Sequence, residues 1–154
     1  MILILCYLIK PYSLIMKHIG NHFKYEDERD RELIQTFHNC IMTSKSGNLA
    51  DILHATVNSP CSRFWVSEDR AAIVLSRMFN GDTLDNMSPT KREMYHELYR
   101  RAIERKRRCP HKTIYEIAID VTGQPAPKFY ITAPSAKTII CKIKKKWKQR
   151  KQSK

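Results

Sequence analysis

Apolar residues recur at helical spacing along most of the chain, in two series that resemble each other. The first helix of the first series is predicted to begin near Asp27 and to turn Leu33, Ile34, Phe37 and Ile41 toward the interior. The matching helix of the second series is predicted to start at residues 88–90, where proline suits a first turn. Its apolar face consists of Met94, Tyr95, Leu98 and Ala102.

A second amphipathic helix follows in each series. It is predicted to open at Asn48 in the first series and at Thr113 in the second, where Glu116 has the spacing of a capping box. Both helices are predicted to end before a proline, Pro60 or Pro125. The apolar faces are Leu49, Ile52, Leu53 and Thr56 in one helix, and Ile114, Ile117, Ala118 and Val121 in the other.

One phrase occurs twice. PCSRFWVSEDRAAIVLSRM (60–78) and PAPKFYITAPSAKTIICKI (125–143) align at a constant offset of 65. Self-similarity at a fixed spacing indicates a duplicated unit, here of roughly 55 to 60 residues. The alternative is a chance resemblance between two amphipathic helical stretches. Identical pairs in and near the phrase are Ile52/Ile117, Pro60/Pro125, Phe64/Phe129 and Ala71/Ala136.

The middle of the phrase predicts a break between two helices. Residues 63–66 and 128–131 are aromatic and β-branched, which favours an extended backbone. Ser67 and Thr132 then suit the N-cap of a third helix. Phe64 and Phe129 are expected to fill the centre of each unit. In the alternative, Trp65 and Tyr130 on the opposite face stack on exposed bases.

These patterns predict a mainly α fold of two tandem three-helix units, an internal duplication, packed as one small domain. Each unit has a short extended aromatic segment before its third helix. A lone unit would be too small for a stable core, which favours packing into one domain. The predicted organisation is a doubtful N-terminal extension (1–15), a near-neutral to acidic unit one (16–82), a basic unit two (83–147) and a basic tail (148–154).

Charge separates the two halves. Residues 1–90 hold 9 Lys and Arg against 10 Asp and Glu, whereas residues 91–154 hold 19 against 5. Such asymmetry indicates a polyanion as partner, nucleic acid first, although a charge run can also be a solvated, solubilising face or a disordered end. The predicted nucleic-acid-binding residues are Arg100, Arg101, Arg105, Lys106, Arg107, Arg108, Lys128, Lys137, Lys142, Lys144, Lys145, Lys146, Lys148, Arg150 and Lys151.

The sequence lacks the motifs that mark several classes of protein function. Only 4 glycines are present, without a glycine-rich phosphate loop. Five widely spaced cysteines with no C-x-x-C suit a reducing cytoplasm, and no metal site, cofactor or catalytic residue is predicted. Paired-carboxylate and nucleophile motifs are also missing, so a non-enzymatic protein is expected.

The second unit resembles helix-turn-helix DNA-binding domains in outline. Ala118 and Gly123 stand where that family places a small residue and a turn glycine, but five apart instead of four. The resemblance covers residues 113–147 and implies that 133–147 is a recognition helix. The residues it would turn to the groove are Ser135, Lys137, Thr138 and Lys142.

The repeated pattern P-x-x-[RK]-F-[WY]-[VI]-[ST] also resembles one in small basic proteins of gut bacteria and their mobile elements. It implies a bacterial cytoplasmic or phage setting and no defined activity. The combined expectation is a protein that binds nucleic acid, DNA first, with little sequence readout, while unit one binds a protein or a second copy. The alternatives are a structural or adaptor module and a peripheral membrane protein.

The first fifteen residues are set apart. MILILCYLI is too short to span a bilayer and lacks the basic start and cleavage site of a signal peptide. Met16 is therefore the expected start of translation. The alternative is a weak anchor at a membrane surface.

Overall fold

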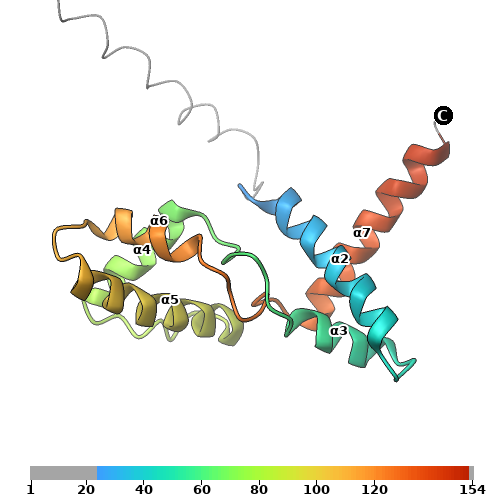
Figure 1. The fold of residues 1–154 in the computed structure, drawn as a ribbon, viewed down its shortest axis with the longest axis horizontal. Helices are drawn as coiled ribbons and strands as arrows, with labels where there is room; N and C mark the ends of the chain where they lie inside the picture. Colours follow the sequence, from blue (N-terminus) through green and yellow to red (C-terminus); the bar gives the residue numbers. More distant parts are fainter. Residues whose placement is uncertain (1–23, 153–154) are drawn as a thin grey trace, which may run out of the picture.

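The described part of the chain, residues 24–152 of a computed structural model, consists of six α-helices and their connections and contains no β-strand (Figure 1). The predictions for residues 1–23 and 153–154, among them the start at Met16, lie outside the described residues. The helices are α2 (Glu26–Thr43), α3 (Leu49–Val57), α4 (Glu68–Phe79), α5 (Pro89–Arg108), α6 (Ile114–Thr122) and α7 (Ala133–Gln152).

The starts of α3, α4 and α6 use the predicted caps, whereas α2 and α5 begin without a side-chain cap. Thr113 and Glu116 form a complete capping box at α6, in which each side chain accepts a hydrogen bond from the backbone of the other residue. The Asn48 side chain accepts a hydrogen bond from the backbone amide of Ala50 in α3. The Ser67 hydroxyl accepts one from the backbone amide of Arg70 in α4. These bonds satisfy backbone donors that a helix start leaves without a partner.

The segments between the second and third helices differ from the prediction. Residues 63–66 and 128–131 are irregular, and Tyr130 adopts a left-handed backbone with φ of 52°. Within the described chain, the one isolated β-bridge here joins Cys61 to Ala126. The prediction of extended segments was wrong because the chain turns sharply at each phrase instead of running straight through it.

The third helices are exchanged between the two halves. α4 packs against α5 and α6, whereas α7 packs against α2 and α3. The molecule therefore has an α2–α3–α7 lobe and an α4–α5–α6 lobe (Figure 1). The sequence predicted units of three consecutive helices, which was wrong in this respect. An apolar stripe specifies that a helix face is covered but not which helix covers it.

The crossing between lobes has matching hydrogen bonds in both copies of the phrase. Cys61 and Ala126 each donate their amide to the other's carbonyl at 3.0 Å. The amide of Phe64 donates to the carbonyl of Thr122, and the amide of Phe129 donates to that of Val57, also at 3.0 Å. Each pair maps onto the other by the offset of 65, so the exchange is symmetric.

One core runs through both lobes. Phe64 and Phe129 are 0% and 2% exposed, which confirms that they are core residues. The Phe64 ring stacks on Tyr130 with 5.9 Å between ring centroids. Buried side chains of all six helices belong to the same hydrophobic cluster. The described chain is therefore a single small all-helical domain.

Candidate nucleic-acid interface

α7 carries the largest group of exposed cations. Its start is set by Thr132, whose hydroxyl accepts a hydrogen bond from the Ser135 amide at 3.3 Å. Ala136 and Ile140 are buried against α2 and α3, while Trp147 is 44% exposed. Residues 148–152, predicted as a tail, continue the helix instead. The exposed cations of α7 are Lys137, Lys142, Lys144, Lys145, Lys146, Lys148, Arg150 and Lys151.

The seven lysines of α7 form no ion pair with any carboxylate in residues 24–152. Lys144 has an aromatic neighbour, its Nζ lying 5.0 Å from the centroid of the Phe37 ring. At 100° per residue, Lys142, Lys145 and Lys148 fall on the side away from the buried stripe. These ammonium groups are free to meet an external anion.

One edge of α7 faces acidic side chains. A groove of about 480 Å³ between α2 and α7 is lined by Asp27 and Asp30 from one helix and by Lys146 and Arg150 from the other. The acidic first turn of α2 partly balances the positive charge on this edge. The outward side of α7 therefore attracts an anion more strongly than the edge beside α2.

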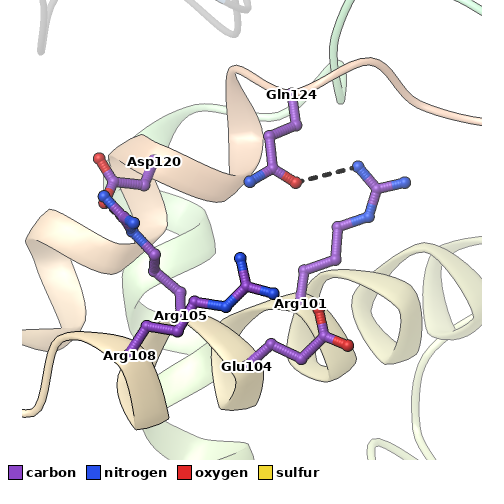
Figure 2. Close-up of a pocket in the computed structure, with 6 residues that line it drawn as sticks. All are labelled: Arg101, Glu104, Arg105, Arg108, Asp120 and Gln124. Atoms are coloured by element: carbon purple, nitrogen blue, oxygen red, sulfur yellow. Dashed lines mark hydrogen bonds and ion pairs between the residues drawn. The ribbon is translucent and has the colours of Figure 1, made fainter.

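A second cationic surface lies where the end of α5 meets α6. A groove of about 340 Å³ lies there. Its lining residues Arg101, Arg105 and Arg108 on α5 face Asp120 and Gln124 (Figure 2). The arginines stand at i, i+4 and i+7, so they share one face of α5. Helix α6 supplies the opposite wall, and Glu104 completes the lining.

Two of these arginines are fixed by hydrogen bonds. Arg101 donates to the Gln124 side chain at 3.2 Å and to the carbonyl of Pro125 at 2.8 Å. Arg105 Nε donates to Asp120 Oδ2 at 2.7 Å, and Lys112 Nζ donates to the same oxygen at 2.6 Å. The hydrogen bonds from Lys112 and Arg105 lower the pKa of Asp120. This carboxylate is thus shared by two cations.

Other members of the basic run hold α5 and its following loop. Arg100 and Arg101 both bind Glu97, and these bonds, Arg100's foremost, lower the pKa of that carboxyl to about 2. Lys106 Nζ donates to the carbonyls of Pro110 and Lys112 at 2.8 and 2.6 Å. Only Arg107 and Arg108, of the six predicted cations on α5, are exposed and without a partner among the described residues.

The two basic runs lie far apart. The end of α5 is at one end of the molecule and the end of α7 at the other (Figure 1). Charge is also evenly divided, with ten basic and six acidic residues on α2, α3 and α7, and ten basic and seven acidic residues on α4, α5 and α6. The sequence analysis assigned all of the excess positive charge to the second unit. In the structure this charge is shared by both lobes, because α7 packs in the lobe of α2 and α3.

Three further predicted site residues are engaged within the protein. Lys128 forms an ion pair with Glu93. Tyr130 is 8% exposed and stacked on Phe64, so its ring has no free face for a base in this conformation. Trp65 is half-buried and packs against the core. The core interpretation of the phrase therefore fits these rings better than base stacking does.

The contacts of α7 also differ from a helix-turn-helix arrangement. In that motif a turn of three or four residues joins two helices that pack together. Here residues 123–132 separate α6 from α7, and α7 packs on α2 and α3 instead. Thr138 was predicted to contact a DNA groove, but its hydroxyl donates a hydrogen bond to the Pro134 carbonyl within α7.

Sequence reasoning missed the carboxylates that organise the arginine groove. The i, i+4 spacing of Glu97 and Arg101 was a usable signal for one of these pairs. The pairing of Arg105 with Asp120 was not visible, because it depends on how α6 lies on α5. Within residues 24–152, no three His, Cys, Asp or Glu side chains gather as a metal site.

No protein-family model matches this chain, and neither a curated protein sequence nor a solved structure is significantly similar to it. Within the described residues, no helix is both long enough and apolar enough to cross a membrane.

Proposed function

We propose that this protein is a non-enzymatic nucleic-acid-binding protein, with DNA as the first candidate, and that α7 is its main binding surface. The observation that carries the proposal is the outward side of α7, where Lys142, Lys145 and Lys148 are exposed and unpaired within the described chain. A helix of 20 residues extends for about 30 Å, which is long enough to follow several phosphates.

The chemistry of this surface favours backbone contacts over sequence readout. Ammonium groups act as point charges toward phosphate oxygens, and such contacts position a protein without reading bases. The polar side chains Ser135 and Thr138 are bonded to the start of α7 itself. We therefore expect similar affinity for duplexes of unrelated sequence.

The test is fluorescence anisotropy of a labelled duplex titrated with protein across a salt series. Wild-type protein should bind with a steep loss of affinity as salt rises. K145E/K148E should reduce the slope of log K against log salt by about 2, because two phosphate contacts are lost. K45E/K91E is the matched control, since it changes net charge equally at exposed lysines outside α7.

Two outcomes would count against the proposal. One is the absence of binding at low salt. The other is an equal loss of slope in K145E/K148E and in K45E/K91E, which would mean that net charge alone drives association. Binding to single-stranded RNA above duplex DNA would keep α7 as the surface and change the ligand.

The groove between α2 and α7 supports one alternative, a protein-interaction or adaptor module of a phage or mobile element. Trp147 is half exposed there, between Ile143 and charges of both signs. A tryptophan in this setting is typical of contacts between proteins. Binding to a protein that is insensitive to salt, together with no retention on DNA, would favour this alternative.

We also propose that the two halves arose by duplication. The support is that equivalent residues, 65 apart, make equivalent backbone hydrogen bonds at the crossing. The copies then diverged in charge, since the third helix of one half has both signs and that of the other has cations alone.

A further inference from the structure

The cations that remain available to an external anion lie at two ends of the molecule. The lysines of α7 supply one group, and Arg107 and Arg108 at the end of α5 supply the other (Figure 1). Neither group is neutralised within the described chain, in contrast to Arg100, Arg105 and Lys128, which bind carboxylates. Each end therefore presents its own positive surface.

The end of α5 combines two arginines that have no partner in the described chain with two that are held by hydrogen bonds. Arg101 and Arg105 are oriented by Gln124 and Asp120, and Arg108 faces the same groove (Figure 2). Arg105 uses Nε for Asp120, and a guanidinium has five N–H donors, so others remain for a phosphate. Arginine also binds phosphate through two parallel bonds, which a lysine cannot do.

The two surfaces are held apart by a continuous interior. The core runs through both lobes, and the exchanged helices connect each lobe to both halves of the chain. Bending a duplex around such a small body costs several kcal/mol, because DNA is stiff over about 150 base pairs. One short, straight duplex would therefore contact one end and leave the other free.

We propose that the protein bridges two segments of nucleic acid, one on α7 and one on the arginine surface formed by Arg101, Arg105, Arg107 and Arg108. This inference rests on the proposed function, since it assigns a second phosphate-binding surface to the same protein. Arg107 and Arg108 provide its free charges, and Arg101 and Arg105 provide fixed donors beside them.

The experiment separates bridging from binding. One unlabelled duplex of about 30 base pairs, short enough to stay straight, is attached to beads, and a fluorescent duplex of unrelated sequence is added with the full chain. Retained fluorescence measures bridging, while anisotropy with the fluorescent duplex alone measures binding. The variants are R107E/R108E at one end and K145E/K148E at the other, with K45E/K91E as the matched control.

Wild-type protein and K45E/K91E should retain the second duplex. R107E/R108E should bind one duplex in solution but lose at least about tenfold of the retained fluorescence, and K145E/K148E should lose it as well. Arg107 and Arg108 have no side-chain partner to lose in the described chain, but they stand in the last turn of α5, where glutamates oppose the helix dipole. R107E/R108E should therefore melt cooperatively at a slightly lower temperature than wild type in circular dichroism. R107Q/R108Q, which removes charge without reversing it, should give the same direction of change.

Retention by R107E/R108E at the wild-type level would overturn the inference, because bridging would then not use the arginine surface. Binding in solution without retention of a second duplex by wild-type protein would also overturn it and leave the proposed function intact. The absence of any binding in solution would overturn both.

Discussion

Cys61 and Ala126 donate their backbone amides to each other's carbonyls at 3.0 Å, and they are equivalent positions in the two copies of the repeated phrase. Both connections between second and third helices therefore pass this point in opposite directions. Beyond it, α4 joins α5 and α6, and α7 joins α2 and α3. The stability of each lobe thus depends on residues from both halves of the chain.

A chain divided between α4 and α5 should reassemble. Expressed alone, residues 16–82 leave the buried face of α4, with Ala71, Val74 and Leu75, uncovered. Exposure of this apolar area disfavours folding, so we expect each half alone to be largely unfolded. Mixing residues 16–82 with 83–154 should restore the helical circular dichroism signal and give one peak on size exclusion. Cooperative melting of either half alone would contradict the exchange.

Truncation of Phe129 should destabilise the whole domain. The ring is 2% exposed at the crossing, and Phe→Ala changes in cores cost about 3 to 5 kcal/mol of unfolding free energy. Urea unfolding of F129A, followed by circular dichroism, should give that loss in a single transition. Y115A is the control, because Tyr115 is 49% exposed and its loss should cost less than about 1 kcal/mol. Two separate transitions would show that the lobes unfold independently.

Glu68 should make stability fall in acid. Burial raises the pKa of this carboxyl, but hydrogen bonds from Tyr25, its own backbone and Lys24 outweigh burial and hold the pKa at about 2, against 4.5 for an ordinary Glu. A lowered folded-state pKa stabilises the protein above the unfolded-state value, and this contribution disappears as the pH falls from 4.5 toward 2.

The variant E68Q should be less stable at neutral pH and should lose part of this acid dependence. Urea midpoints measured between about pH 2 and 7 would show both effects. The control is E104Q, since the Glu104 side chain is 55% exposed and its ion pair with Arg100 is long, at 3.5 Å. If E68Q loses stability in acid as steeply as wild type, other carboxyls such as Glu97 would dominate the acid dependence.

Two cysteines should differ in reactivity. Burial raises the pKa of the Cys61 thiol to about 12, whereas Cys141 is exposed on α7. Iodoacetamide at about pH 7.5 should alkylate Cys141 in the native protein and leave Cys61 unmodified. Peptide mapping by mass spectrometry would measure both. Duplex DNA should slow modification of Cys141, because that residue lies on the outward side of α7. Equal rates with and without DNA would place the nucleic acid elsewhere.

The sequence was sufficient for local structure. Thr113 and Glu116 predicted a capping box, and the structure contains it, because these capping bonds join residues only three apart in the chain. The offset of 65 identified the equivalent positions that bond at the crossing. Phe64 and Phe129 were recognised as core residues because phenylalanine side chains are among those most often fully buried.

The candidate site was predicted less well. The exposed lysines of α7 could be located, since a cation opposite an apolar stripe faces solvent. The roles of Arg105, Lys106 and Lys128 could not, because their partners Asp120, the loop carbonyls and Glu93 come from other elements or a loop. Whether a cation is free or paired depends on distances that spacing along the chain does not contain.

By itself, then, the sequence determined the six helices and their buried faces, which depend on residues close together in the chain. It also determined the repeat and the total charge, which need no three-dimensional information. Tertiary structure alone decided that α4 and α7 change places, that the charge is shared by both lobes, and that the free cations lie at opposite ends. The reason is that an apolar stripe indicates that a helix face is buried but does not specify which helices cover it. The crossing at Cys61 and Ala126 and the packing of α4 and α7 in their lobes join distant segments, so spacing along the chain does not reveal them.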